Sequence, residues 1–232
     1  MSQNWALVPL NNLDQAKSRL GPALDCAGRR ALVLAMAEDA LSALVEVDSI
    51  ERILLVSNEP EAGTLLRDWP IEVFYSADHE GLNLELVQAA AYAATQGADR
   101  ILIVHADLPW LTPETLVRFV TDCPPGVLRA AQCKLGVGTN ALLTPLPLPL
   151  PLVFGPESLQ RFTEGAAARG LDLHIVTDRR LSFDIDSPED LQQLLEASPS
   201  NPAPATRTAR VLEHIHYFAP IARTEQRIDR EA

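Results

Sequence analysis

The chain has little positive charge and almost no lysine. Among its 232 residues, 31 are acidic and 19 are Lys or Arg, which gives a formal net charge of −12, and Lys17 and Lys134 are the only lysines. A field of this sign repels polyanions and no basic block offsets it, so we expect no nucleic-acid partner. A nucleotide would be repelled too, so its phosphates must be met locally by a metal ion, backbone N–H groups or a few cations.

Long apolar runs, a leader segment and metal-ligand cysteine spacings are also missing. No stretch of eighteen apolar residues occurs, so we expect no membrane span and no membrane partner. The N-terminal residues show no basic segment followed by an apolar one, which argues against secretion. Three cysteines (Cys26, Cys123 and Cys133) are an odd number without metal spacing, and we interpret them as reduced thiols of a cytoplasmic protein.

The chain does contain apolar runs that alternate with helical stretches, a pattern typical of βαβ units and a mostly parallel sheet. A hydrophobic fraction of 47% is sufficient for one real core. Residues 101–104 are apolar on both faces, which favours a central strand. The pattern predicts strands at 5–9, 53–56, 71–74, 101–104, 127–131, 140–143, 174–176 and 182–185, and helices at 27–45, 82–95, 113–120, 156–170 and from 188 onward.

Two proline-rich segments mark connections. Proline at every second position excludes a helix at 144–151, and we interpret this run as an extended connector rather than as a ligand for proline-recognising domains. Residues 1–197 are predicted to form the domain, and residues 198–232 a Pro/Ser-rich linker followed by a tail. Val211, Leu212, Ile215 and Phe218 fall at helical spacing, so the tail can form a short helix that docks on the domain or on a second subunit, or a frayed end. We expect no catalytic role for it.

Two aspartate clusters are the most informative feature. Asp107 follows the strand at 101–104, and Asp184 and Asp186 follow an apolar segment near the end of the domain. Ligands of open α/β sheets bind beyond the carboxyl ends of the strands, and carboxylates there can hold Mg²⁺ against a phosphate. Since residues two apart in a strand point the same way, Asp184 and Asp186 are expected to act together. The alternative is that each aspartate only caps the helix after it; two clusters favour a metal-assisted nucleotide site.

Other segments can contribute to such a site. The loop after the first strand carries Lys17 and Arg19, which can serve phosphates but are equally compatible with solvated surface cations; it lacks the P-loop pattern. The segment at 136–140 offers glycines and a Thr hydroxyl, and the segment at 154–158 opens a helix, where free N–H groups bind anions or Glu157 simply caps the turn. An Asp-x-Asp phosphatase of the haloacid dehalogenase type is disfavoured, because its motif belongs after the first strand.

The motifs together resemble the CofC/FbiD guanylyltransferases, in order and over about residues 5–195. The matching segments are Trp5-Ala6-Leu7-Val8-Pro9-Leu10, Ala16-Lys17-Ser18-Arg19-Leu20, Gly81-Leu82-Asn83, Asp107-Leu108-Pro109, Gly138-Thr139-Asn140-Ala141, Phe154-Gly155-Pro156-Glu157-Ser158 and Asp184-Ile185-Asp186-Ser187-Pro188-Glu189-Asp190. One departure is Asn11, because members commonly have Lys there, and a cation near the phosphates is therefore missing.

The resemblance implies a MobA-like, GT-A-like nucleotidyltransferase fold: an α/β three-layer sandwich with a mostly parallel mixed sheet. It also implies transfer of GMP from GTP to a small phosphorylated acid, with pyrophosphate release, in coenzyme F-420 biosynthesis. Phosphoenolpyruvate and 3-phospho-D-glycerate are favoured as acceptors and 2-phospho-L-lactate is possible. A homodimer is expected by family.

The resemblance also assigns roles to residues. Catalysis would fall to Lys17, Arg19 and Asp107, and Mg²⁺ would be held by Asp107, Asp184 and Asp186. Nucleotide-binding residues would be Leu7, Pro9, Lys17, Gly81, Leu82 and Asn83, and those that contact the acceptor would be Thr139, Gly155 and Ser158. Two alternatives stay open: another nucleotidyltransferase of this fold that uses CTP or a sugar phosphate, and a nucleotide-binding regulator without turnover. The five histidines are expected to be structural or surface groups.

Overall fold

A seven-stranded mixed sheet forms the centre of the computed structural model, which describes residues 3–11, 13–76, 81–124, 126–196 and 206–214. The strand order is β3-β2-β1-β4-β6-β5-β7, and only β6 runs antiparallel to its neighbours β4 and β5. The strands are β1 (Asn4–Pro9), β2 (Ile50–Ser57), β3 (Glu72–Tyr75), β4 (Arg100–Val104), β5 (Leu128–Gln132), β6 (Thr139–Pro145) and β7 (Leu173–Val176). The predicted central strand is β4, in the middle of the sheet.

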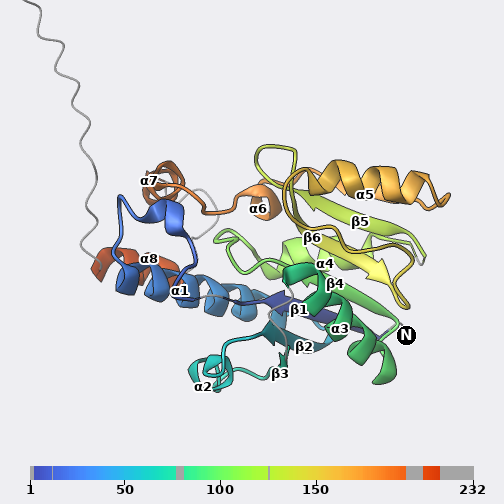
Figure 1. Cartoon of the computed structure of the whole chain (residues 1–232), viewed down its shortest axis with the longest axis horizontal. Helices are drawn as coiled ribbons and strands as arrows, with labels where there is room; N and C mark the ends of the chain where they lie inside the picture. The colour runs from blue at the N-terminus through green and yellow to red at the C-terminus, as the bar shows by residue number, and fades with distance from the viewer. Residues whose placement is uncertain (1–2, 12, 77–80, 125, 197–205, 215–232) are drawn as a thin grey trace, which may run out of the picture.

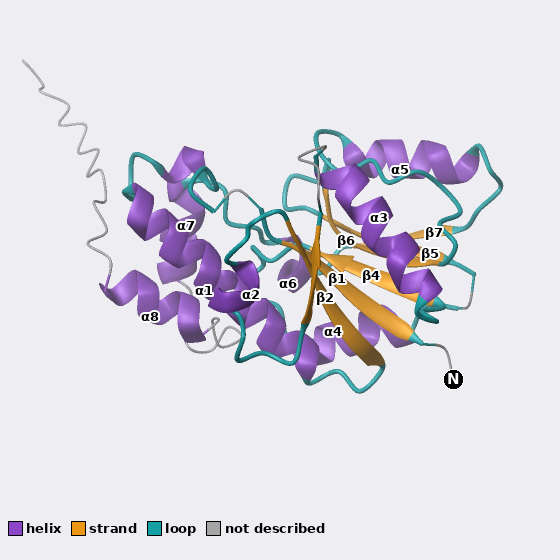
Figure 2. Ribbon diagram, turned by 60° about the horizontal axis from the view of Figure 1, so that its bottom comes forward, coloured by secondary structure: helices purple, strands orange, loops and turns teal. Residues whose placement is uncertain are grey.

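Helices cover both faces of the sheet and make three layers (Figure 1). They are α1 (Cys26–Val45), α2 (Ala62–Leu65), α3 (Leu82–Thr95), α4 (Pro113–Thr121), α5 (Ser158–Ala167), α6 (Arg179–Ser182), α7 (Pro188–Glu196) and α8 (Thr206–His214), with a 3-10 turn η1 (Ser18–Leu20). One core packs α1, α4 and α7 on one face, and a second packs α3 and α5 on the other. Figure 2 shows α3 and α5 on the opposite side of the sheet from α4. The predicted α/β three-layer sandwich is confirmed.

Local signals explain where several helices begin. Asp25 accepts a hydrogen bond from the Gly28 N–H at the start of α1, and Thr112 accepts one from the Thr115 N–H at the start of α4, with Pro113 in the first turn. None of the helices in the described part of the chain combines the length and the hydropathy that a bilayer crossing requires.

The connector and the helix within the tail both pack on the domain. After β6, residues 146–154 run without regular structure, and Leu150, Leu152 and Phe154 are buried in the core beneath α3 and α5. The tail helix α8 lies on α1: Thr208 donates from both its N–H and its hydroxyl to Asp39 at 2.8 Å, and Leu212 is buried. The predicted linker at 198–204 and the predicted apolar positions Ile215 and Phe218 lie outside the described residues.

Three local predictions were wrong. Residues 182–185 are not a strand, because α6 ends at Ser182 and the chain then runs through an extended loop to α7. The fifth helix begins at Ser158 rather than 156, and Glu157 stands before it in a left-handed conformation (φ 55°) without a side-chain capping bond. The short helix α2 was not predicted. Its sequence is too short to show a helical period.

Candidate active site

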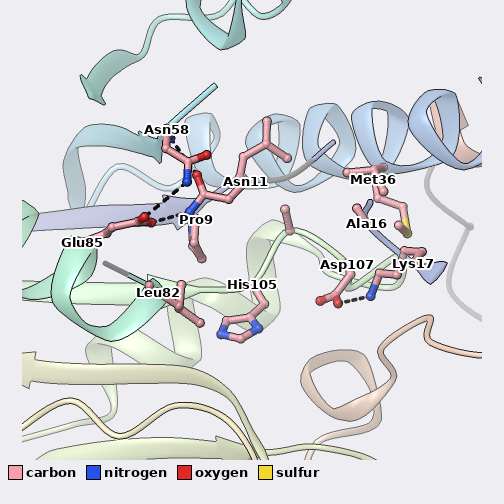
Figure 3. A pocket seen from close by; sticks show the side chains of 14 residues that line it. Pro9, Asn11, Ala16, Lys17, Met36, Asn58, Leu82, Glu85, His105 and Asp107 are labelled. Carbon is pink, nitrogen blue, oxygen red and sulfur yellow. Dashed lines mark hydrogen bonds and ion pairs between the residues drawn. The ribbon is translucent and has the colours of Figure 1, made fainter. Parts of the chain in front are cut away.

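A cavity of about 500 Å³ opens where β1 and β4 end at their carboxyl side. β2 and β3 lie beyond β1 and the remaining strands lie beyond β4, so the cavity sits where the strand order reverses, the usual ligand position in open α/β sheets. Its walls, shown in Figure 3, are Pro9, Leu10, Asn11, Ala16, Lys17, Val33, Met36, Asn58, Gly81, Leu82, Glu85, His105, Ala106 and Asp107.

Lys17 is the centre of charge at one end of this cavity. Its ammonium lies 2.5 Å from Asp107 Oδ2 and 2.8 Å from Asp186 Oδ1, and its side chain is 13% exposed. Burial opposes the ammonium charge, but the negative charges of Asp107 and Asp186 outweigh it and raise the pKa of Lys17 above its usual value. Lys17 also has a left-handed backbone (φ 53°), which is uncommon outside glycine. Lys17 is therefore held protonated between two carboxylates.

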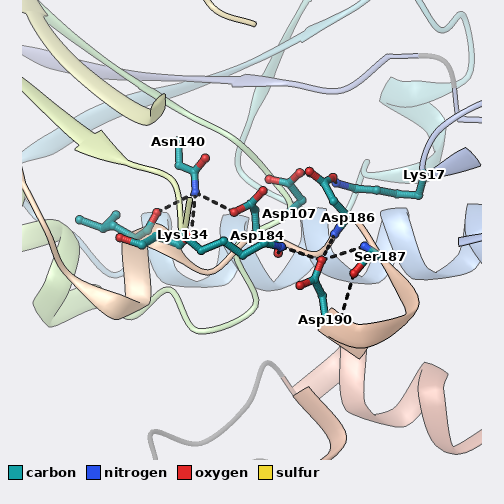
Figure 4. Close-up of polar contacts among 10 residues, drawn as sticks. Lys17, Asp107, Lys134, Asn140, Asp184, Asp186, Ser187 and Asp190 are labelled. Atoms are coloured by element: carbon teal, nitrogen blue, oxygen red, sulfur yellow. Dashed lines mark hydrogen bonds and ion pairs between the residues drawn. The ribbon is translucent and has the colours of Figure 1, made fainter. Parts of the chain in front are cut away.

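Two of the three predicted aspartates, Asp107 and Asp186, contact that ammonium, and Asp184 lies close to Asp107, as Figure 4 shows. The pKa of Asp184 is raised by burial and then by the charge of Asp107, so Asp184 lies within the field of the other two carboxylates. Despite burial, the Lys17 charge lowers the pKa values of both Asp107 and Asp186. None of the three caps a helix, because Thr112 caps α4 and Ser187 accepts from the Asp190 N–H at the start of α7. The capping alternative is therefore excluded.

The loop that carries Asp184 and Asp186 is held in place by residues to which the sequence analysis assigned no role. Lys134 donates to the Asp184 carbonyl oxygen at 2.7 Å and pairs with Asp190 at 2.6 Å. Asp190 also accepts from the N–H groups of Asp186 and Ser187, both at 2.8 Å. The Asn140 amide donates to Asp184 Oδ1 at 3.4 Å. The rarity of lysine in this chain was a signal that could have pointed to Lys134.

The donor set of the three aspartates suits a hard divalent cation. Asp107 Oδ1 is buried and has no hydrogen-bond partner in the described structure, so an oxygen ligand is available there. Over the described residues, no group of three or more His, Cys, Asp or Glu side chains stands ready-made around a common metal position. With Lys17 between them, Asp107 and Asp186 already share one positive charge.

The predicted nucleotide-binding residues divide into two groups. Pro9, Lys17, Gly81 and Leu82 line the cavity. The other two do not: Leu7 is fully buried in the core, and Asn83 exchanges two hydrogen bonds with the Phe154 backbone (2.7 and 3.0 Å). Arg19, which was predicted to be catalytic, is exposed on η1 and is not among the residues that line the cavity. Asn83 thereby ties the start of α3 to the connector.

The predicted acceptor residues are not among those that line the cavity. The hydroxyls of Thr139 and Ser158 are both buried and 3.2 Å apart. Thr139 immediately precedes Asn140, whose amide reaches Asp184. Gly155 is exposed and has φ 120°, a conformation that L side chains rarely adopt, which explains glycine at this position.

The cavity also contains residues that sequence reasoning missed. At the end away from Lys17, Asn11 and Asn58 surround the carboxylate of Glu85, which is 1% exposed. His105 lines the cavity and is buried, and burial lowers its pKa, so it is neutral near pH 7. The sequence predicted His105 to be a structural or surface group, and the structure places it in the cavity wall.

Comparisons with known proteins agree with this geometry. Residues 4–201 match the family model described as "Guanylyl transferase CofC like". Proteins named phosphoenolpyruvate guanylyltransferase are similar: that of Sphaerobacter thermophilus is 35% identical over 84% of this chain and 93% of its own length, and that of Rubrobacter xylanophilus is 36% identical over 84% and 94%.

Solved structures share the fold. A protein of Desulfovibrio desulfuricans G20, described as a nucleotide-diphospho-sugar transferase, superposes with a TM-score of 0.74 at 18% identity over 92% of this chain and 96% of that one. A cytidylyltransferase from Leptospira borgpetersenii gives a TM-score of 0.57 at 15% identity over 92% and 94%. At these identities the likeness shows the nucleotidyltransferase-type fold and nothing finer.

Proposed function

The chain belongs to the CofC-like guanylyl transferase family, and we propose that it moves GMP from GTP to the phosphate of phosphoenolpyruvate and releases pyrophosphate. The similar proteins that carry this activity in their names support phosphoenolpyruvate as the acceptor. 3-Phospho-D-glycerate and 2-phospho-L-lactate are chemically related and compete as acceptors in the test below.

One observation supports the site most directly: Lys17, Asp107 and Asp186 converge at one end of a cavity of about 500 Å³, and Asp184 lies in the same field. That volume is within the range of small-molecule sites, about 300–1,000 Å³. We place the triphosphate of GTP toward Lys17 and the acceptor toward Thr139 and Ser158, with Asp184 near both.

The proposed reaction depends on alignment of the acceptor phosphate with the α-phosphorus of GTP more than on a general base. The second pKa of a phosphate monoester is about 6, so the acceptor is mostly dianionic at neutral pH and needs no general base. An acceptor phosphate oxygen forms a bond to the α-phosphorus of GTP, and the bond from that phosphorus to the bridging oxygen of the β-phosphate breaks. Lys17, held protonated, supplies positive charge to the phosphates at no cost in reorganisation.

Mg²⁺ is part of this proposal. Asp107, Asp184 and Asp186 would hold it, and when bound it would neutralise charge on the phosphate oxygens. The chain's own part is to keep these carboxylates together through Lys134, Asn140 and Asp190.

Pyrophosphate release with GTP, MgCl₂ and each of the three acids tests the proposal. We expect release with phosphoenolpyruvate to exceed that with the other two acids, and CTP to replace GTP poorly. Tight GTP binding without release with any acceptor would favour the regulator. Release with CTP or with a sugar phosphate in place of these substrates would favour another nucleotidyltransferase.

A cytoplasmic homodimer completes the proposal, as the family resemblance implies. Light scattering after size exclusion chromatography of the full chain would report the mass of the assembly, and a monomer at micromolar concentration would contradict it.

A further inference from the structure

Glu85 is an unusual residue for the wall of a nucleotide site. It lies in the first turn of α3, is 1% exposed, and accepts from the amide groups of Asn11 and Asn58 (3.4 Å for Asn58). No Lys or Arg of the described residues pairs with it. A buried carboxylate without a cation is costly unless hydrogen bonds satisfy it, and two neutral amides satisfy only part of its capacity for about four bonds.

The Asn11 amide is fixed in orientation. Asn11 donates from Nδ2 to Glu85 and accepts at Oδ1 from the Asn58 backbone N–H at 2.7 Å, so its carboxamide cannot turn over without losing both bonds. Each of the two amide nitrogens carries a second N–H beyond the one aimed at Glu85. The cluster therefore presents carboxylate acceptors beside amide donors, in a fixed order.

This cluster lies at the opposite end of the cavity from Lys17 and Asp107, with Leu82 and His105 between them (Figure 3). If the triphosphate lies toward Lys17, as the proposed function requires, the base of the nucleotide lies toward Glu85. Guanine presents two donors, N1–H and the 2-amino group, next to one acceptor, O6. That pattern is the complement of a carboxylate beside an amide N–H.

We propose that Glu85, oriented by Asn11 and Asn58, selects guanine by accepting from its N1–H and 2-amino group, while an amide N–H of the pair donates to O6. The inference rests on the proposed function and names the base-recognition site within it. Adenine has a lone pair at N1 and a C–H at position 2, so it would face the carboxylate without any donor and would leave buried polar groups unpaired.

Equilibrium binding without acceptor tests the inference on the native protein first. We would titrate the full chain with GTP, ITP and ATP in MgCl₂ by calorimetry. Inosine lacks only the 2-amino group, so ITP should bind about 10- to 100-fold more weakly than GTP, the value of one hydrogen bond to a charged group. ATP should bind at least about 100-fold more weakly. Equal binding of GTP and ITP, or of GTP and ATP, would overturn the inference whatever any variant does.

Substitution then assigns the effect to Glu85. Glu85→Gln should weaken GTP binding about 30-fold and reduce the GTP-to-ITP ratio to within about threefold, because the amide replaces one acceptor oxygen by an NH2 donor and so cannot accept from both N1–H and the 2-amino group, one at each oxygen. Glu164→Gln is the matched control: Glu164 is an exposed carboxylate on α5 that bonds only Gln160 among the described residues, and its GTP affinity should equal that of the native chain. An unchanged GTP-to-ITP ratio in folded Glu85→Gln would overturn the inference, as would the same loss in the control.

Measuring nucleotide binding and pyrophosphate release separately distinguishes the base-recognition proposal from the transferase proposal. If GTP binds with the predicted base preference but no acid yields pyrophosphate, the base site stands and the transferase proposal falls. If pyrophosphate is released and Glu85→Gln keeps the native base preference, the transferase proposal stands and the base site falls. A chain that binds none of the three nucleotides overturns both.

Discussion

Asp107→Asn removes one carboxylate charge from the centre of the site and keeps the shape of the side chain. In the native chain Asp107 is the nearer of the two partners of Lys17, at 2.5 Å against 2.8 Å for Asp186. Removing one member of a buried pair costs about 3–5 kcal/mol when the other charge is left alone. Here Lys17 keeps Asp186, so we expect a loss of about 1–2 kcal/mol in the free energy of unfolding.

The effect on turnover should be much larger than the effect on stability. In the proposed function Asp107 would offer an anionic oxygen to Mg²⁺; its Oδ1 is buried without a partner among the described residues, and its Oδ2 pairs with Lys17. Loss of a metal ligand that acts in the transition state is worth about 4 kcal/mol or more, or about 10³-fold in kcat. The assay is pyrophosphate release at saturating GTP and phosphoenolpyruvate, together with urea unfolding of the same preparation.

The control is Asp25→Asn, at the exposed N-cap of α1, where Asn serves as well as Asp. It should leave both turnover and unfolding within error of the native chain. The reasoning about Asp107 would be refuted by a kcat within tenfold of the native value. It would also be refuted by a stability loss above about 4 kcal/mol, because that would give Asp107 a structural role instead.

Four further outcomes are expected. The difference in the free energy of unfolding between the native chain and Asp107→Asn should be constant from about pH 5 to 8. It should shrink as the pH falls below 3.8, the ordinary pKa of Asp, because the pKa of Asp107 is lowered in the folded state. Urea midpoints across that pH range check this, and a difference that grows in acid would contradict it. Asn11→Lys should raise the KM for GTP severalfold with little change in kcat, since an ammonium there would pair with Glu85 rather than with phosphates. A rise in kcat would instead indicate that the native chain lacks a cation that the phosphates need. Ser158→Ala should raise the KM for the acceptor more than that for GTP and cost about 1 kcal/mol of stability, because the Thr139 hydroxyl loses its partner; the opposite order of KM effects would argue against this placement. Lys134→Met should lower kcat about 10- to 100-fold with a smaller effect on the KM for GTP, as expected of a residue that positions the Asp184 loop, whereas native kinetics would show that Asp190 and Asn140 suffice to hold it.

The sheet and most helices could be predicted because their periodicity is long and their caps are explicit. The strand 101–104 is apolar on both faces and occupies the middle of the sheet, and the helix predicted at 82–95 has the same bounds as α3. The strand predicted at 182–185 was wrong. Phe183 and Ile185 alternate with polar residues there, and both are buried because α6 and the following loop pack on the core; a four-residue pattern cannot distinguish this from a strand.

Within the site, residue types could be predicted and contacts could not. Lys17 and the three aspartates stood out by type and position, but nothing in the sequence indicates that the ammonium lies between Asp107 and Asp186, which are 79 residues apart. Glu85 gave no signal, because a single Glu in the first turn of a helix is also what the helix dipole favours. Only the fold brings it against Asn11, 74 residues earlier in the chain.

The balance of charges at the cavity favours the binding of an additional cation. Asp107 and Asp186 share the single ammonium of Lys17, Asp184 lies within their field, and Lys134 is already paired with Asp190. Lys17 is the only Lys or Arg among the described residues that line the cavity, and His105 is neutral near pH 7 because burial lowers its pKa. A triphosphate and a phosphorylated acid would both approach this surplus of negative charge, in a chain whose summed field repels them as well. Binding of both substrates therefore requires positive charge that these side chains do not provide. If the proposal is right, GTP affinity should fall steeply when Mg²⁺ is chelated, and an affinity that does not depend on Mg²⁺ would mean that the aspartates serve only to position Lys17.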